Sequence, residues 1–297
     1  MLTTAPKTIF RFPNFQIAHD SFRRSRDYVK SPFRYPGGKY YALKHIMPFI
    51  NCVPHDEYRE PFVGGGTVFF AKTKCAFNWL NDLETDLITT YQVIADPLLQ
   101  KKLAMRIARE EATPKRHVEV KMLTTENDLD LAFKTFYLNR TSYSGIINNP
   151  AWGYSEGKSS PPANWVKFLQ EAGEKLREVQ ITSLDFSKVI SAKPKGSRVL
   201  LYLDPPYFHA DQKRAYTKPF IEQDHIRLAK LLRETPFLFC LSYDDCPEIR
   251  DLYAWAQIYE RAWLYNTANI KGIARKKGNE LVITNYHVTR HQQKSFL

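Results

Sequence analysis

The sequence predicts an α/β fold with a doubly wound, mostly parallel sheet, and three observations carry this prediction. Short apolar runs bounded by polar turns, such as residues 199–203, are typical of buried parallel strands. Segments with helical spacing of apolar residues separate these runs. A glycine-rich turn at residues 64–66 follows the first run, and an acid, Asp82, follows the second. This order of strand, glycine turn, helix, strand and acid is typical of the first half of a doubly wound sheet.

The N-terminal elements follow from turn residues and from the spacing of apolar residues. Residues 1–30 have no sustained period and carry an excess of positive charge, so we expect a basic arm. A Pro-Gly-Gly-Lys turn at residues 36–39 predicts a helix over residues 40–50 that opens on the two glycines. The next expected elements are a strand at 57–62, a helix at 67–72, a strand at 75–80 and a helix at 86–95.

The middle of the chain, residues 97–178, is expected to be a mainly helical insertion, because no alternating strand pattern interrupts it. Residues 98–111 and 129–141 have helical spacing, and residues 149–162 form a loop rich in Gly, Ser and Pro. A further helix follows, since one helical face collects the apolar residues Trp165, Phe168, Leu169, Ala172, Leu176 and Val179.

Strands resume after the insertion, and helices expected at 222–233 and 248–255 separate them. The expected strands are residues 179–184, 199–203 and 237–242, with 256–265 and 280–286 pairing as a closing antiparallel hairpin. The predicted domains are an arm (1–30), an α/β domain (31–96 and 179–290), the helical insertion (97–178) and a tail (291–297).

The charge of the chain favours a polyanionic partner. Lys and Arg number 43 against 31 Asp and Glu, which gives a net charge of +12 over 297 residues. The excess lies in the arm, the insertion, the loops around residue 204 and the stretch 271–277. A single exposed Lys or Arg is usually just a solvated surface residue, but this distribution as a set fits a phosphate-binding face.

Composition also excludes several classes of protein. Hydrophobic residues make up 43% and charged residues 25%, which argues against wholesale disorder. No apolar run approaches the roughly 20 residues of a membrane span, and the N-terminus has no signal-peptide core. The four cysteines form no CxxC pair, which predicts neither a zinc site nor a disulfide framework. We expect a cytoplasmic protein with reduced thiols, no membrane partner and no metal.

The strongest chemical signal is the Leu-Asp-Pro-Pro-Tyr run that ends the strand at residue 203. Ligands of doubly wound sheets bind beyond the carboxyl ends of the strands, so Asp204 is expected in the crevice. Pro205 and Pro206 have no N–H, so this turn offers a carboxylate and carbonyl oxygens to a substrate that presents N–H groups, such as a nucleobase amino group. Tyr207 would stack on the base. The alternative is an ordinary strand-terminating turn in which Tyr207 only packs.

A second signal surrounds the glycine-rich turn, in the run Arg-Glu-Pro-Phe-Val-Gly-Gly-Gly. Its candidate cofactor-binding residues are Glu60, Phe62, Gly64 and Gly66. Glycine lets a ligand approach the backbone at a helix N-terminus, but the GxGxxG spacing of dinucleotide sites is absent. Asp82 is placed either to accept ribose hydroxyls or to cap a helix. S-adenosyl-L-methionine, which has a ribose and no phosphate, fits this set.

A third signal is the run Phe-Arg-Tyr-Pro-Gly-Gly-Lys. Lys39, on a helix that opens on glycines, could meet a ligand carboxylate, and Tyr35 could cover an apolar or cationic group. Taken alone, this run is best interpreted as a capped surface helix.

Six runs in this order resemble the Dam-type (D12 class) family of S-adenosylmethionine-dependent DNA adenine-N6 methyltransferases. They are FRYPGGK, REPFVGGGTVFF, LNDLETDLI, FYLNRTSYSG, LDPPYF and NELVITNY. The resemblance spans about residues 31–286, whereas the DPPY motif alone is shared with RNA and protein methyltransferases. It implies a Rossmann-like methyltransferase sheet, with the insertion at 97–178 as a target-recognition domain.

The resemblance also implies roles for the residues of the pocket. Tyr35 and Lys39 would contact the methionine end of the cofactor, and Asp82 its ribose. Asp185 and Phe186 would lie near its adenine. The turn that receives the flipped target adenine would consist of Asp204, Pro205, Pro206 and Tyr207, and Asp204 is also a candidate cofactor-binding residue. The Tyr-Pro pair at residues 35–36 replaces a common Trp-Ala pair of the family.

DNA contacts are expected at two places. At the start of the target-recognition region the candidates are Asn139, Arg140 and Tyr143, and in the basic stretch they are Lys271, Arg275, Lys276 and Lys277. The expected partner is double-stranded DNA, together with a cognate restriction endonuclease acting on the same site, in a bacterial or phage-encoded system associated with the nucleoid.

The chemistry of the motif leaves alternatives open. Methylation of adenine N6 in RNA or of cytosine N4 in DNA would suit the same turn, although the motif order and the helical insertion favour duplex DNA. A remote alternative is a non-catalytic DNA-binding protein on the same fold, against which the intact residues 204–207 argue.

Overall fold

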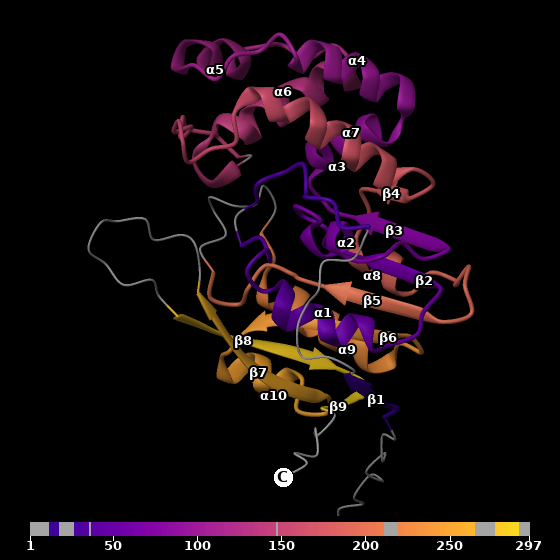
Figure 1. The fold of residues 1–297 in the computed structure, drawn as a ribbon. Helices are drawn as coiled ribbons and strands as arrows, with labels where there is room; N and C mark the ends of the chain where they lie inside the picture. Colours follow the sequence, from indigo (N-terminus) through magenta and orange to yellow (C-terminus); the bar gives the residue numbers. More distant parts are fainter. Residues whose placement is uncertain are drawn as a thin grey trace, which may run out of the picture.

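Strands from both halves of the chain form one central sheet in the computed structural model, which describes residues 12–17, 27–35, 37–146, 148–210, 219–264 and 277–290 (Figure 1). The strands are β1 (Asn14–Ile17), β2 (Glu57–Glu60), β3 (Phe77–Asn81), β4 (Gln180–Thr182), β5 (Val199–Leu203), β6 (Leu238–Asp244), β7 (Gln257–Leu264), β8 (Lys277–Thr284) and β9 (His287–Arg290). The central sheet has the order β4-β3-β2-β5-β6-β8-β7. The first five strands in this order are parallel, and β8 is antiparallel to β6 and β7. The predicted α/β fold with a closing antiparallel hairpin is confirmed.

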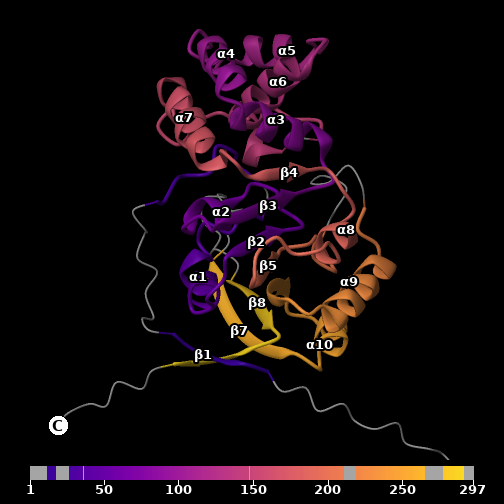
Figure 2. The same ribbon diagram turned by 90° about the vertical axis from the view of Figure 1, so that its right-hand side faces the viewer.

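Helices cover both faces of this sheet, as a doubly wound topology requires. The α-helices of the described residues are α1 (Leu43–Asn51), α2 (Thr67–Ala71), α3 (Thr85–Ala95), α4 (Pro97–Ile107), α5 (Pro114–Lys121), α6 (Asp128–Thr141), α7 (Trp165–Leu176), α8 (Phe186–Ile190), α9 (Glu222–Glu234) and α10 (Pro247–Leu252). α1 and α2 lie on one face and α8, α9 and α10 on the other (Figure 2). The side chains of β5 alternate accordingly: Leu200 and Tyr202 pack with α1 and α2, whereas Leu201 and Leu203 pack with α8 and α9.

Helices α4 to α7 form a layer at one end of the molecule, beyond the edge strand β4 (Figure 1). α7 buries the predicted apolar face, including Trp165 and Leu169. α4 begins where the Asp96 side chain accepts two backbone N–H groups. α3 packs against α6 and α7, so this layer shares a core with the first half of the sheet domain. The domain boundaries at residues 97 and 178 stay a prediction. None of the helices within the described ranges is long and apolar enough to cross a membrane.

The register of the parallel strands aligns their carboxyl ends at one edge of the sheet. Arg59 in β2 pairs with Trp79 in β3 on one side and with Leu201 in β5 on the other. All three strands end within two residues of these pairs. The residues that follow β2, β3 and β5 therefore gather at this edge, where ligands bind in doubly wound folds.

The helix expected at residue 40 begins three residues later. Ala42 donates its N–H to the Lys39 carbonyl at 3.0 Å, which closes a separate turn before α1 starts at Leu43. Gly38 donates to the Tyr35 carbonyl at 3.0 Å in the turn before that. The two glycines thus shape a turn and not the first turn of a helix. Lys39 consequently does not lie at a helix N-terminus, contrary to the expectation from the sequence.

Part of the expected N-terminal arm is a strand. β1 pairs in parallel with β9, with Asn14 opposite His287 and Ile17 opposite Arg290. Phe15 meets Tyr286 edge to face, with the ring centroids 5.6 Å apart. A four-residue strand contains too few residues to show a sustained period. For the same reason the sequence did not reveal β9 or the five-residue helix α8; α5 was also not anticipated.

Arg59 ties the middle of the sheet to α8. Its guanidinium is fully buried and contacts the Glu57 carboxylate at 2.7 Å. It also donates to the carbonyl oxygens of Val189 and Ala192 at 2.7 and 3.0 Å. A buried charge of this kind is tolerated because its hydrogen bonds and its counter-charge are all supplied by the fold.

We expect Arg59→Ala to lower the free energy of unfolding by about 3–5 kcal/mol, because the substitution leaves the buried Glu57 carboxylate without its counter-charge. Urea unfolding followed by circular dichroism measures this loss. Lys167→Ala on the exposed face of α7 is the matched control, expected to change stability by less than about 0.5 kcal/mol. A loss below about 1 kcal/mol for Arg59→Ala would contradict this account of the buried pair.

Candidate active site

A cavity of about 700 Å³ lies at the carboxyl edge of the parallel strands. Segments that are far apart in the sequence line it, including the glycine-rich turn, the loop after β3, the start of α8 and the turn after β5. All the predicted cofactor-binding and catalytic residues line this single cavity, namely Tyr35, Lys39, Glu60, Phe62, Gly64, Gly66, Asp82, Asp185, Phe186, Asp204, Pro205, Pro206 and Tyr207. Their assembly in one place is a finding of the structure, whereas the role of each residue stays a prediction.

The glycine-rich turn approaches its neighbours too closely for a larger residue. Gly64 and Gly66 have positive φ angles of 45° and 64°, and Gly66 is the residue that precedes α2. A Cβ atom on Gly65 would lie 2.8 Å from the Cβ of Tyr35. The turn therefore packs directly beneath Tyr35, which joins the segment before α1 to the cavity.

The Asp82 carboxylate fixes the glycine-rich turn through a hydrogen bond. One carboxylate oxygen accepts the Gly64 N–H at 2.8 Å, and the other accepts the Glu84 N–H at 3.1 Å. Burial raises the pKa of Asp82 to about 6, although the N–H donors oppose the shift. Asp82 thus organises the loop that lines the cavity, and a contact to a ribose would be additional. Glu84, which is also buried, lines the cavity as well and was not anticipated from the sequence.

Asp204 is paired with Lys39. The Lys39 ammonium lies 2.8 Å from Oδ1 of Asp204, and the Ser242 hydroxyl donates to the same oxygen at 2.9 Å. Lys39 also donates to the Gly37 carbonyl at 3.1 Å and stands 4.8 Å from the centre of the Tyr207 ring. The lysine that was expected to meet a ligand carboxylate therefore lies against the carboxylate of the Asp-Pro-Pro-Tyr turn. The carboxylate side chain keeps 22% of its surface exposed.

Tyr207 is fixed by an acid that the sequence analysis did not single out. Its hydroxyl donates a hydrogen bond to the carboxylate of Glu280, a fully buried residue of β8. Burial raises the pKa of Tyr207 well above its ordinary value, and the charge of Glu280 adds to the shift. The ring of Tyr207 lies tilted against Tyr243, with centroids 6.0 Å apart. Glu280 belongs to the run NELVITNY, so the signal was present in the sequence, but spacing alone could not connect it with Tyr207.

Glu60 lies beneath the cavity and is almost fully buried. Its carboxyl accepts the Tyr58 hydroxyl at 2.5 Å. Burial raises the pKa of Glu60 to about 8, while Tyr58 and Lys72 act in the opposite direction. The carboxyl group therefore holds its proton over much of the neutral pH range.

Arg227 of α9 fixes Asp185 and Phe186 at one end of the cavity. Arg227 forms two hydrogen bonds with the Asp185 carboxylate, both at 2.9 Å. Its guanidinium lies 4.2 Å from the centre of the Phe186 ring, and Phe62 packs on that ring at 5.3 Å. This end of the cavity thus combines two aromatic rings with a fixed carboxylate. Arg227 was not anticipated, because it belongs to none of the motifs and lies 42 residues after Asp185.

Two of the predicted DNA contacts are buried. Asn139 is 1% exposed, and its amide accepts the Arg34 N–H at 2.9 Å and donates to the carbonyl oxygens of Arg34 and Gly145 at 2.6 and 2.9 Å. Arg140 lies buried over the ring of Phe168 at 5.1 Å. Both side chains are thus packed within the fold, and a direct contact of either with DNA stays a prediction.

Of the remaining predicted DNA contacts, the structure describes only Tyr143 and the backbone of Lys277. Tyr143 has 57% of its surface exposed. Lys271, Arg275 and Lys276 lie outside the described residues, and Lys277 is the first residue of β8.

Residues 35–267 match the family of D12 class N6 adenine-specific DNA methyltransferases. Among individual proteins, the Type II methyltransferase M1.LlaDCHI of Lactococcus lactis subsp. cremoris is 26% identical over 86% of this chain and 95% of its own length. The Type II methyltransferase M.MjaIII of Methanocaldococcus jannaschii is 28% identical over 87% of this chain and 99% of its own. A DNA adenine methylase of Vibrio cholerae is 25% identical over 84% and 93%.

The raised pKa of Glu60 predicts how stability depends on pH. The folded chain retains this proton up to about pH 8, whereas the unfolded chain releases it near the ordinary value of 4.5, so the stability associated with Glu60 is lost as pH rises between these values. Glu60→Gln does not titrate and keeps an acceptor for Tyr58. We expect it to shrink the stability difference between pH 5 and pH 8 by about 1–3 kcal/mol.

Urea unfolding of wild type and variant at both pH values checks this expectation. Glu174→Gln on the exposed surface of α7 serves as the control and should keep the wild-type difference. If Glu60→Gln shows the same difference as the wild type, Glu60 does not carry the proton.

Proposed function

The chain belongs to the D12 class of N6 adenine-specific DNA methyltransferases, and we propose that it acts on double-stranded DNA by rotating one adenine into the cavity described above. As a member of this family it transfers the methyl group of S-adenosyl-L-methionine to the N6 amino group of adenine in DNA. The family match therefore selects adenine in DNA over the RNA and cytosine-N4 alternatives. The observation that carries the residue-level proposal is the gathering of the glycine-rich turn, Asp82 and the Asp-Pro-Pro-Tyr turn in one cavity.

The residues at one end of the cavity fit the cofactor. Phe62 and Phe186 offer apolar faces on which a purine can pack, and Asp82 and Glu84 offer acceptors for ribose hydroxyls. The turn at residues 64–66 lines the cavity and offers backbone atoms that a ligand can approach. S-adenosyl-L-methionine, when bound, supplies an electrophilic methyl group.

The residues at the other end fit an adenine that has left the duplex. Unstacking and unpairing a base costs a few kcal/mol, which contacts in the pocket must offset. Tyr207, held by Glu280, offers a ring for stacking. Asp204 and Pro205 both line the cavity, and the Asp204 carboxylate and the backbone carbonyl of Pro205 would accept the two N6 hydrogens of the base.

Hydrogen-bond acceptors beside the N6 amino group would also promote the methyl transfer itself. The amino nitrogen of adenine is a poor nucleophile because its lone pair is delocalised into the ring. Asp204 and the Pro205 carbonyl favour the tetrahedral form of this nitrogen and stabilise the positive charge that develops on it during transfer. Asp204 can then take the proton that the methylated nitrogen releases. Lys39 and Ser242 both contact Oδ1, so they fix the orientation of the carboxylate while part of it remains accessible.

The helical layer is our candidate for target recognition, because it reaches the rim of the cavity. Ile146 lines the cavity, and the exposed Tyr143 precedes it by three residues. Asn139 binds Arg34, the neighbour of Tyr35, and so fastens α6 to the segment that covers the glycine-rich turn. DNA bound across this rim would contact the helical layer and the base pocket together. The expected attraction of the net positive charge for phosphate is independent of sequence.

Type II methyltransferases among the similar proteins suggest a restriction-modification role. In that role a cognate restriction endonuclease would act on the same DNA site and be blocked by methylation. Mapping N6-methyladenine in the DNA of cells that express this chain would identify the site. Sensitivity of that site to endonuclease in cells lacking the chain would test the partnership.

Asp204→Ala is expected to lower methyl transfer about 1000-fold or more while leaving cofactor binding within a few-fold of wild type, because the main proposed role of the carboxylate is to accept an N6 hydrogen of the base. Transfer is measured with labelled S-adenosyl-L-methionine and genomic DNA, and binding by calorimetry. Asp251→Ala on the surface of α10 is the matched control. Near-normal turnover by Asp204→Ala would overturn the assigned role.

The two functions of Tyr207 can be separated by two substitutions. Tyr207→Ala removes the stacking ring, which is worth about 1–3 kcal/mol, so kcat/KM should fall about 5- to 150-fold. Tyr207→Phe keeps the ring and loses only the hydrogen bond to Glu280, so its fall should be about tenfold or less. Steady-state methylation of DNA measures both. Equal losses in the two variants would argue against stacking.

A further inference from the structure

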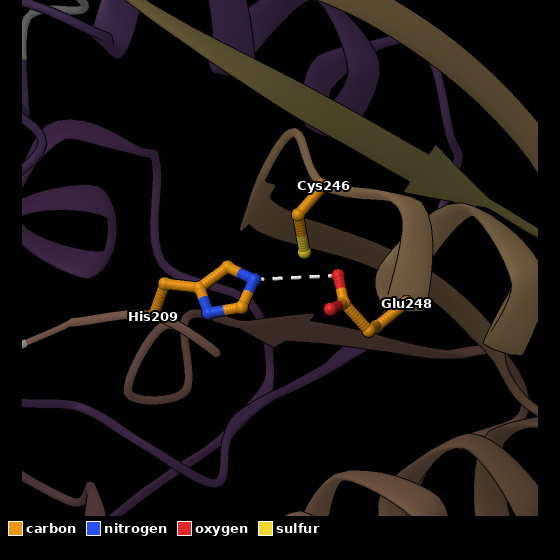
Figure 3. A group of neighbouring side chains, drawn as sticks. All are labelled: His209, Cys246 and Glu248. Atoms are coloured by element: carbon orange, nitrogen blue, oxygen red, sulfur yellow. Dashed lines mark hydrogen bonds and ion pairs between the residues drawn. The ribbon is translucent and has the colours of Figure 1, made fainter.

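Three side chains of different chemistry meet outside the cavity, beside the turn that carries Tyr207. They are His209, Cys246 and Glu248, and their nitrogen, sulfur and oxygen atoms all lie within 4.8 Å of one another (Figure 3). His209 follows Tyr207 by two residues. Cys246 is the residue before α10, and Glu248 lies in the first turn of that helix.

We propose that these three side chains form a site for Zn²⁺. An imidazole, a thiolate and a carboxylate are the ligand types that zinc takes, and three protein ligands leave its fourth position to water. The sulfur ligand disfavours Mg²⁺ and Ca²⁺, which prefer oxygen. A thiolate and a carboxylate together balance the two positive charges of the ion, and the thiol proton passes to solvent on binding.

The spacing of the three groups is close to what a tetrahedral ion needs. Zinc bonds of about 2.0–2.3 Å place neighbouring ligand atoms about 3.3–3.7 Å apart. Nε2 of His209 and Oε2 of Glu248 are already 3.3 Å apart. Both of these side chains are exposed, so they can turn toward the sulfur without disturbing the core. Cys246 is buried while the other two side chains are exposed, so the site combines a fixed sulfur ligand with two ligands that face solvent.

The surroundings hold the two sides of the site in place. Phe208 donates its backbone N–H to Asp244 at 3.2 Å, and Asp245 pairs with Arg250 of α10 at 2.6 Å. The segment carrying His209 and the turn carrying Cys246 are therefore already joined by hydrogen bonds. A bound ion would add a direct link between the turn after β5 and the start of α10, and so raise the stability of the folded chain by mass action.

The full-length chain, treated with a chelator and reduced, provides the test. Zn²⁺ is titrated in competition with a chromophoric chelator, and we expect one tightly bound ion per chain that Mg²⁺ does not displace. His209→Ala and Cys246→Ser should each weaken binding about 100-fold or more, since each removes a ligand. Cys52→Ser, at the end of α1, is the matched cysteine control and should bind like the wild type.

A spectroscopic readout identifies the sulfur ligand independently. Co²⁺ in place of Zn²⁺ should give a thiolate charge-transfer band in the wild type and in Cys52→Ser, and none in Cys246→Ser. Substitution at the buried Cys246 could impair folding, so Glu248→Gln, at an exposed ligand, is a second variant. It too should weaken Zn²⁺ binding. The proposal is overturned if the wild type does not bind Zn²⁺, or if binding is unchanged in His209→Ala and Glu248→Gln.

Discussion

The alignment of three parallel strands is the constraint on which the rest of this protein depends. Since β2 pairs with β3 and β5 in a fixed register, the chain must deliver Glu60, Asp82 and Asp204 to the same edge of the sheet. A shift of one residue in β5 would exchange its two faces, so that Leu201 and Leu203 would leave the core of α8 and α9. The hydrophobic pattern that stabilises the sheet therefore also determines which acids meet in the cavity.

Carboxylates gathered at one edge repel one another, and the structure reduces this repulsion in a different way for each acid. Glu60 remains protonated because it is buried, so it adds little negative charge near neutral pH. Asp82 accepts two backbone N–H groups from the loops on either side. Asp204 is paired with Lys39 and stays partly exposed. Of the three, only Asp204 has a side-chain cation as its partner and no backbone N–H to hold, which distinguishes it from the two acids that shape the cavity.

The spacing and type of neighbouring residues predicted the individual helices, strands and turns. The apolar face of α7, the strand β5 and the glycine-rich turn follow from spacing and from residue type, and the structure has them. Contacts between distant segments were not predictable in the same way. Glu280 reaches Tyr207 only because β8 inserts beside β6, and Arg227 reaches Asp185 only because α9 packs on α8. The pairing of β1 with β9 was unpredictable for the same reason, because the two strands lie at opposite ends of the chain.

The burial of Asn139 changes what the run FYLNRTSYSG signifies. A run shared with DNA-binding enzymes suggests DNA contacts, but the Asn139 amide makes three hydrogen bonds to the backbone of Arg34 and Gly145. A Cβ on Gly145 would lie 2.2 Å from the Arg34 carbonyl oxygen, so these two segments are also in close contact. In this chain the run therefore holds the helical layer against the segment that lines the pocket. Because this anchor uses only backbone atoms of Arg34 and Gly145, it leaves the exposed side chain of Tyr143 available for a contact with DNA.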